Sequence, residues 1–421
     1  MNERQTSPYQ GAGGSMTEAR GRIEDAAASC EAHAAAADTT GRLAAETVAL
    51  LTRAGFARHF VPRVWNGTEG TFTELFAAVA AVGEGCASAA WCAALWATHA
   101  KYAAHLPLEG QRELWGESPD VRIAAGLRPS GVATSLPGGW LLSGTWECVS
   151  GITDADWLLL AAPAAGEPPL PAPGIRLFAV PAASVRIRRS WSSTGMRGTG
   201  SHTAVLEFPV VVPEHRTCAL ADVLAGLPGP GLPHCHTAPA YLGAGVLMCA
   251  PALGAARGAL REWTAWAART RSRTRPDGDR AGLHLVLAQV ADDIEAAELL
   301  LRDAALRADS GTRAERDVAR NRRVAAAAAH LLVTAVERLF REAGMYACGS
   351  PGPLERAWRD VHVLAAHQAL RRETAATQYA ASVFADLTPE AGAVADRAHV
   401  LTQVISQASR PADVKEVAGV H

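Results

Sequence analysis

Lysine is nearly absent from this chain of 421 residues, and neither sign of charge is in excess. Lys101 and Lys415 are the two lysines among 40 basic residues, which oppose 42 acidic residues to give a net charge of −2. A protein that binds nucleic acid or an anionic membrane surface normally carries a basic excess or patch, so neither partner is expected. Arginine in place of lysine, beside many alanines, indicates a GC-rich coding sequence.

Aromatic residues are also few, at 6%, but hydrophobic residues make up 49% of the chain. That apolar fraction excludes a mostly disordered protein. At about 100–200 residues per domain, the length predicts two or three domains around a large core.

Pairs of cysteines at CxxC spacing are missing, and residues 1–20 hold no apolar stretch of the kind a signal peptide needs. The cysteines are therefore predicted to be reduced, mostly buried thiols of a cytoplasmic protein. His234-Cys235-His236 brings together residue types that bind metals. Successive residues rarely point at one ion, and no second pair has zinc-site spacing, so no metal is expected.

Charged residues are missing between Asp222 and Arg257. The window Ala238–Ala256 is long enough to span a membrane. It contains Pro239 and Pro251 and is rich in alanine and glycine, which favours a helix buried on all sides inside a soluble assembly.

Hydrophobic periodicity divides the chain into an α+β protein with an N-terminal helical domain, a central antiparallel β-barrel or sandwich, and a C-terminal four-helix bundle. The predicted parts are a disordered leader (1–16), the helical domain (17–118), the β domain (119–225), the bundle (236–405) and a tail (406–421).

The β domain is predicted from short apolar runs that alternate with turn residues, with no helix between them. These runs are 121–125, 140–142, 157–162, 175–180, 185–187 and 204–212. The bundle is predicted from four long helical segments, 238–270, 281–309, 314–345 and about 358–386.

This order of parts resembles the acyl-CoA dehydrogenase superfamily. The resemblance covers about residues 40–385, and its general motifs are Ala54-Gly55-Phe56 with Val61-Pro62, and Gly195-Met196-Arg197-Gly198-Thr199-Gly200-Ser201. Three further segments are similar to the flavin-dependent monooxygenase branch. They are Cys86-Ala87-Ser88-Ala89-Ala90-Trp91 with His99, Trp146-Glu147-Cys148-Val149-Ser150-Gly151, and Arg359-Asp360 with His367. The segment Val64-Trp65-Asn66-Gly67 departs from the superfamily, which usually has a Gly-Gly turn there.

A dehydrogenase of this superfamily needs a carboxylate base beside the thioester carbonyl. The matching position here reads Ala366-His367-Gln368, and no Asp or Glu stands between Ala238 and Arg261, where the alternative base would lie. The missing base argues against dehydrogenation, although the fold alone would permit it.

The resemblance implies an oxygenase that receives FMNH2 or FADH2 from a separate NAD(P)H:flavin reductase. With O2 it would form a C4a-hydroperoxyflavin and hydroxylate a small aromatic or polycyclic substrate. Oxygenation at nitrogen or sulfur, and a dehydrogenase-like flavin oxidase, remain alternatives. The choice between FMN and FAD stays open, and a homotetramer is expected from family habit. No GxGxxG motif opens a strand–turn–helix unit, which fits reduction by a partner protein.

Three residues are predicted to be catalytic. His367 would contact the flavin hydroperoxide or the substrate, from a helix face shared with Asp360 and Leu364. His99 would bind or deprotonate the substrate, or else pack in the core. Ser150 would contact flavin N5, with Gly151 allowing close backbone approach.

The remaining candidates are cofactor-binding residues. Trp146 would pack beside the isoalloxazine, unless it is a barrel-core tryptophan. Thr199 and Ser201 lie in a glycine-rich turn that could hold a phosphate. Arg269 or Arg273 would reach a flavin phosphate across a subunit interface, unless they simply form a solvated helix end.

Overall fold

The computed structural model describes residues 16–165, 174–229, 231–271, 278–349 and 351–387. Helices come first, then a sheet, then a second set of helices, as the periodicity predicted. The predicted leader before Met16 and the predicted tail 406–421 lie outside the described residues.

The N-terminal part is helical up to Trp115. Its helices are α1 (Met16–Thr40), α2 (Ala45–Arg53), α3 (Phe72–Gly83), α4 (Ala87–Ala103) and α5 (Leu108–Trp115). Thr71 caps α3: its side chain accepts from the backbone N–H of Glu74, whose carboxylate accepts from Thr71 N. This reciprocal pair satisfies two backbone donors that the first turn of a helix leaves unpaired.

The β part contains eight described strands, β1 (Ile123–Gly126), β2 (Val132–Leu136), β3 (Gly139–Val149), β4 (Trp157–Ala165), β5 (Ile175–Pro181), β6 (Arg186–Arg188), β7 (His202–Pro213) and β8 (Thr217–Ala219). They are ordered β6-β7-β3-β2-β4-β5-β8, with β1 beside β4. The prediction of a purely antiparallel sheet was wrong, because β4 pairs in parallel with both β1 and β2. The exposed β2 and the short β8 carry too little apolar pattern to be found from the sequence.

The C-terminal part is again helical. Its helices are α6 (Leu220–Ala225), α7 (His234–Thr237), α8 (Ala240–Arg271), α9 (Gly278–Asp309), α10 (Glu315–Ala343), α11 (Met345–Cys348), α12 (Pro353–Ala365) and α13 (Arg372–Leu387). The predicted single helix over 358–386 was wrong, because α12 ends at Ala365 and a short 3-10 turn, η6 (Gln368–Leu370), precedes α13. His367 adopts an extended backbone there, and its side chain accepts from Ala369 N.

The second half of the uncharged stretch before Arg257 lies in α8, which packs against α3, α4, α9, α10 and α12. Among the described residues, one helix, Ala240–Arg269, is long enough and apolar enough to cross a membrane. In its most apolar window, 83% of the residues are buried inside the protein. Neighbours on several sides explain why α8 needs no polar face.

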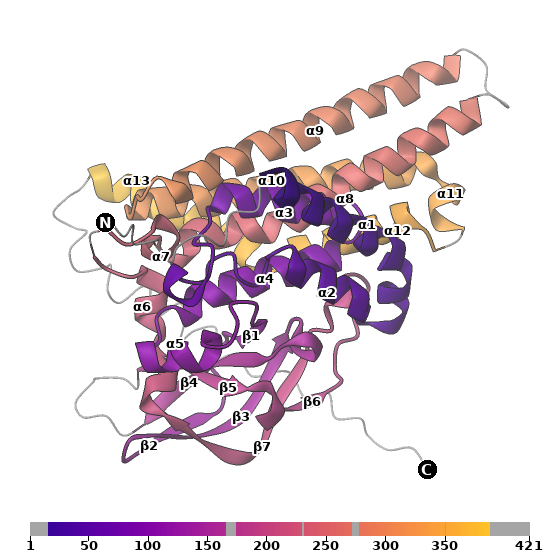
Figure 1. The fold of residues 1–421 in the computed structure, drawn as a ribbon. Coiled ribbons are helices and arrows are strands. Elements are labelled where there is room, and N and C mark those ends of the chain that lie inside the picture. Colours follow the sequence, from indigo (N-terminus) through magenta and orange to yellow (C-terminus); the bar gives the residue numbers. More distant parts are fainter. Residues whose placement is uncertain (1–15, 166–173, 230, 272–277, 350, 388–421) are drawn as a thin grey trace, which may run out of the picture.

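Helix α4 occupies the centre of the molecule, between the sheet and the long helices (Figure 1). It contacts β1 on one side and α3, α8 and α12 on others. Nearly all of its residues are buried. Side chains on α4 therefore face the junction of all three parts of the chain.

The segment Thr194–Ser201 is held against α12 by two neighbouring residues. Arg359 donates to the carbonyl oxygen of Thr194 and forms an ion pair with Asp38 of α1 at 2.8 Å. Asp360 accepts from Met196 N. The 3-10 turn η4 (Arg197–Thr199) in this segment also contacts α1 and α4.

Gly195 permits this contact, and its replacement gives the first prediction. A Cβ atom at Gly195 would lie 2.4 Å from the carbonyl oxygen of Arg359 and 2.8 Å from Asp360 N. Because both are backbone atoms, Gly195→Ala should force the segment away from α12 and lower the free energy of unfolding by about 1–3 kcal/mol. Urea denaturation measures the change.

Gly282→Ala is the matched control, because a Cβ atom there meets nothing within 4 Å on α9. It should leave the stability unchanged or raise it by up to ~1 kcal/mol through helix propensity. Equal midpoints for Gly195→Ala and the wild type would contradict the proposed contact.

Candidate active site

Ser150 stands at the end of β3, where the strand is deformed by two features. The register between β3 and β7 shifts between Trp146 and Val149, and Gly151 turns the chain with a φ of 68°. A bulge of this kind re-aims the side chains that follow it. It leaves Ser150 half-buried, with its Oγ accepting a hydrogen bond from Trp91 Nε1 of α4 at 3.1 Å.

Behind Ser150 lies a chain of hydroxyl groups. Ser150 Oγ is 2.7 Å from Ser201 Oγ, which is 2.7 Å from Thr199 Oγ1. Thr199 Oγ1 donates to the carbonyl oxygen of Met196 at 2.8 Å. Thr199 and Ser201 are only 2% and 5% exposed. Their predicted role in holding a phosphate is therefore not supported, since both hydroxyl groups point into the protein toward Ser150.

His367 also contacts Trp91. The two rings meet edge to face with centroids 5.5 Å apart. His367 is half-buried, and burial lowers the pKa of its imidazole. The ring is therefore neutral at pH 7. Ser150, Trp91 and His367, from three different parts of the chain, form what we call the neutral triplet.

His99 lies on α4 about 12 Å along the axis from Trp91. It is buried, and its Nδ1 is 2.7 Å from the carbonyl oxygen of Ile123 in β1. Because a carbonyl only accepts, Nδ1 carries the hydrogen and Nε2 keeps its lone pair. Burial lowers the pKa of His99 to about 4, so the ring is neutral.

Trp146 has the alternative role considered for it. Its ring is 1% exposed in the core of the sheet domain, and its Nε1 donates to the carbonyl oxygen of Ala161 at 2.7 Å. The backbone of Gly126, Gly131 and Gly144 packs close to the ring. It therefore has no face to offer a flavin ring, and the prediction that it packs beside the isoalloxazine is not supported.

Arg269 lies near the end of α8 that projects beyond the sheet and the N-terminal helices (Figure 1). Its side chain is 64% exposed and 3.9 Å from Glu262. It does not meet the neutral triplet within this chain. Arg273 lies outside the described residues.

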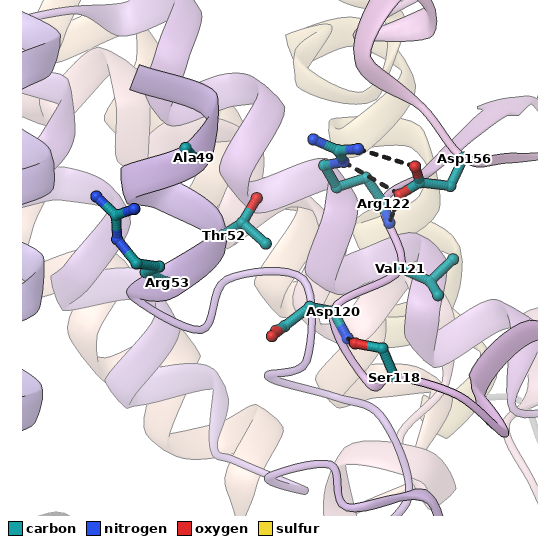
Figure 2. A pocket seen from close by; sticks show the side chains of 8 residues that line it. All are labelled: Ala49, Thr52, Arg53, Ser118, Asp120, Val121, Arg122 and Asp156. Carbon is teal, nitrogen blue, oxygen red and sulfur yellow. Dashed lines mark hydrogen bonds and ion pairs between the residues drawn. The ribbon is translucent and has the colours of Figure 1, made fainter. Parts of the chain in front are cut away.

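A surface hollow of about 450 Å³ lies between α2 and residues 118–122. Figure 2 shows the paired side chains of Arg122 and Asp156 on one side and Arg53 on the other. Asp120, which also lines the hollow, is held by Arg58. No predicted site residue lines this hollow, and its paired charges suit it poorly to an uncharged ring.

Sequence reasoning also missed a buried polar cluster at the other end of α4. Lys101 is 2% exposed and donates to the carbonyl oxygen of Ala238 at 2.8 Å, and burial lowers its pKa to about 8. The ring nitrogens of His105 and His236 are buried without a hydrogen-bond partner among the described residues. Burial and the nearby Lys101 lower both imidazole pKa values, so the two histidines are neutral polar core residues. In the described part of the chain, no group of three His, Cys, Asp or Glu side chains is arranged to hold a metal ion.

Comparison with known proteins shows the family to which the chain belongs. The family model for the C-terminal domain of acyl-CoA dehydrogenases matches residues 246–372. The oxygenase component of the FADH2-dependent resorcinol hydroxylase of a Rhizobium species is 30% identical over 385 residues, which cover 86% of this chain and 93% of the relative. The chain belongs to the oxygenase components of two-component flavin-dependent monooxygenases.

Solved structures agree with the assignment. The crystal structure of a 3-HSA hydroxylase from Rhodococcus has a TM-score of 0.81 and 26% identity, and the match covers 87% of this chain and 97% of that one. XiaF from Streptomyces, solved in complex with FADH2 and glycerol, has a TM-score of 0.80 and 25% identity over 87% of this chain and 95% of its own. The protein is therefore an oxygenase component, as the motifs of the monooxygenase branch indicated.

The neutral triplet fits the reduced flavin that such monooxygenases use. The isoalloxazine ring is flat and largely apolar with polar atoms at its edge, and the triplet offers an aromatic ring beside a half-buried hydroxyl and a neutral imidazole. Ser150, Trp91 and His367 would hold that ring, which supplies the electrons that activate O2. A neutral, half-buried site also limits water access.

The second prediction is that Asp360, which holds the segment Thr194–Ser201 through Met196 N, makes the stability of the protein depend on pH. Burial raises the pKa of Asp360 from 3.8 to about 6. A carboxyl group whose pKa is raised by folding stabilises the folded state most below its unfolded pKa, and this contribution is lost as the pH rises through about 6.

Asp360→Asn keeps an oxygen that accepts from Met196 N but cannot ionise. The difference in free energy of unfolding between the variant and the wild type should therefore shift in favour of the variant by about 1–2 kcal/mol as the pH rises from 5 to 8. Urea midpoints at both pH values measure this gain. Asp292→Asn, at an exposed position of α9, is the control. A difference in urea midpoint between Asp360→Asn and the wild type that stays constant from pH 5 to pH 8 would refute the raised pKa of Asp360.

Proposed function

We propose that the protein hydroxylates a small aromatic substrate, using reduced flavin supplied by a separate reductase and O2. The observation that carries this proposal is the neutral triplet, in which Trp91 donates to Ser150 and meets the ring of His367. The reaction would proceed through a C4a-hydroperoxyflavin, as the family resemblance implies. Ser150 would meet N5, and His367 would hold the oxygen to be transferred.

His99 would orient the substrate. Its Nε2 lone pair can accept a hydrogen bond from a phenol, because Nδ1–H is committed to Ile123 O. A pKa of about 4 makes His99 a weak base on its own. Proton transfer becomes favourable as the phenolate forms beside it, because the anion stabilises the imidazolium. A phenolate is activated at its ring carbons, which supports aromatic hydroxylation over oxygenation at nitrogen or sulfur.

The relatives' names support the choice of substrate and cofactor. One is called a resorcinol hydroxylase and another a 3-HSA hydroxylase, and two are associated with FADH2. Phenols and FADH2 are therefore the first compounds to test. The dehydrogenase alternative lacks support, because α8 carries no Asp or Glu before Glu262.

We also propose a homotetramer in the cytoplasm. Support comes from α9, where Leu285, Leu299 and Leu306 are each more than half exposed. Apolar side chains repeated along one exposed helix are typical of a surface that other subunits cover. Light scattering should give a mass near four times 44.0 kDa. A monomer at micromolar concentration would contradict this assembly.

A rapid-mixing experiment tests the proposed reaction. The protein is mixed anaerobically with chemically reduced FAD, or with reduced FMN in parallel, and then with O2. The proposal expects a long-lived absorbance band of a peroxyflavin, and a hydroxylated product when a phenol such as resorcinol is present. Immediate formation of oxidised flavin and H2O2, with or without phenols, would contradict it.

His367→Ala should reduce the product formed per O2 consumed by about tenfold or more, because a positioned imidazole is lost from the reacting oxygen. His362→Ala is the matched control on the neighbouring helix α12, since His362 Nδ1 donates to the carbonyl oxygen of Trp358 and its Nε2 lies 3.7 Å from Glu337 of α10. Product yield and H2O2 are measured together. Equal yields for the two variants would remove His367 from the reaction.

A further inference from the structure

The chain of hydroxyl groups behind Ser150 has a hydrogen-bond donor at one end and an acceptor at the other. At one end, Trp91 Nε1 can only donate, and it lies 3.1 Å from Ser150 Oγ. At the other, the carbonyl oxygen of Met196 can only accept, and it lies 2.8 Å from Thr199 Oγ1. Between them Ser150, Ser201 and Thr199 follow one another at 2.7 Å spacing.

Counting hydrogens gives one arrangement for this chain. Thr199 must spend its hydroxyl hydrogen on Met196 O, because a carbonyl has none to give. Ser201 must then donate to Thr199, and Ser150 must donate to Ser201. Ser150 Oγ therefore accepts a hydrogen bond from Trp91, donates its own hydrogen to Ser201, and keeps one free lone pair.

We propose that Thr199 and Ser201 are positioning residues that leave Ser150 able only to accept a hydrogen bond from the flavin, so that the site binds reduced flavin in preference to oxidised flavin. The inference rests on the proposed function, in which N5 of the flavin meets Ser150. N5 carries a hydrogen in reduced flavin and only a lone pair in oxidised flavin. Reduced flavin can therefore donate to Ser150, whereas oxidised flavin would set two lone pairs against each other.

Burial keeps the chain from reversing. Thr199, Ser201 and Trp91 are 2%, 5% and 7% exposed, so water has little access to supply a replacement partner. The accepting end is also held in place: Met196 O accepts from Trp191 Nε1 at 3.0 Å, and Met196 N donates to Asp360. Reversal would break the hydrogen bond from Thr199 Oγ1 to Met196 O and leave these two buried oxygens 2.8 Å apart with no hydrogen between them.

The preference suits an oxygenase that receives its flavin from another protein. Reduced flavin must be captured at low concentration, and oxidised flavin must leave after each turnover. A site that forms a hydrogen bond with reduced flavin but not with oxidised flavin captures the first and releases the second. The preference equals the ratio of the two dissociation constants, so it can be measured without turnover.

Thr199→Val tests the proposal. Valine has nearly the same shape, leaves no room for water, and frees the hydroxyl hydrogen of Ser201 to turn toward Ser150. Ser150 can then donate to N5 of oxidised flavin. The ratio of the dissociation constants of oxidised and reduced flavin, measured by anaerobic fluorescence titration, should fall about tenfold from its wild-type value. The potential of the bound two-electron couple should fall by about 30 mV.

Two controls isolate the hydrogen-bond direction. Thr199→Ser keeps the hydroxyl and should keep the wild-type ratio. Thr203→Val removes another buried hydroxyl of the same region, whose Oγ1 bonds to Ser190 rather than to the chain, and should also keep the ratio. Ser201→Ala breaks the chain one link nearer to Ser150 and should lower the ratio, which covers the case in which Thr199→Val does not fold.

The outcomes separate this inference from the proposed function. Flavin binding with an unchanged ratio in Thr199→Val, or in Ser201→Ala, would overturn the inference and leave the oxygenase assignment standing. A wild-type protein that binds neither form of flavin would overturn both. A lower ratio in Thr203→Val as well would show a general packing effect and would also overturn the inference.

Discussion

The contact between α12 and the segment Thr194–Ser201 is the constraint on which the site depends. Arg359 and Asp360 hold this segment from its outer side, through Thr194 O and Met196 N. Its inner side supplies the hydroxyl groups that reach Ser150. Since Arg359 also pairs with Asp38 of α1, one pair of residues joins the first helix, the sheet domain and the last helices around α4. The shape of the site is thus fixed by parts of the chain that are far apart in sequence.

Burial keeps the histidines of the site uncharged. Burial lowers the pKa values of both His99 and His367, so two residues that could carry charge are neutral. The ion pair of Arg122 with Asp156 lines the hollow drawn in Figure 2, which no residue of the neutral triplet lines. Neutral donors and acceptors suit a flavin ring that must react with O2 without exchanging protons with water. An enzyme that removes a proton next to a thioester would instead need a carboxylate in this place.

The order of the three parts could be predicted from the sequence, because it depends on local hydrophobic patterns. Ser150 and His367 were singled out through their motifs, and their catalytic roles stay predictions. The sequence did not reveal that Thr199 and Ser201 point inward, since a glycine-rich turn has the same composition whether it faces a phosphate or another side chain. The end of α12 at Ala365 was missed because Ala366, Gln368 and Ala369 are ordinary helix residues. Both roles of Trp146 stayed open at the level of sequence, because an aromatic ring near a motif packs equally well in the core.

A crystal structure determined after anaerobic soaking with reduced flavin would test the central claim most directly. The account predicts the flavin ring beside Trp91 and His367, with N5 about 3 Å from Ser150 Oγ. The distances from Ser150 to Ser201 and from Ser201 to Thr199 should remain unchanged. A ring bound with N5 turned away from Ser150, or seated in the hollow beside Arg122 and Asp156, would contradict it.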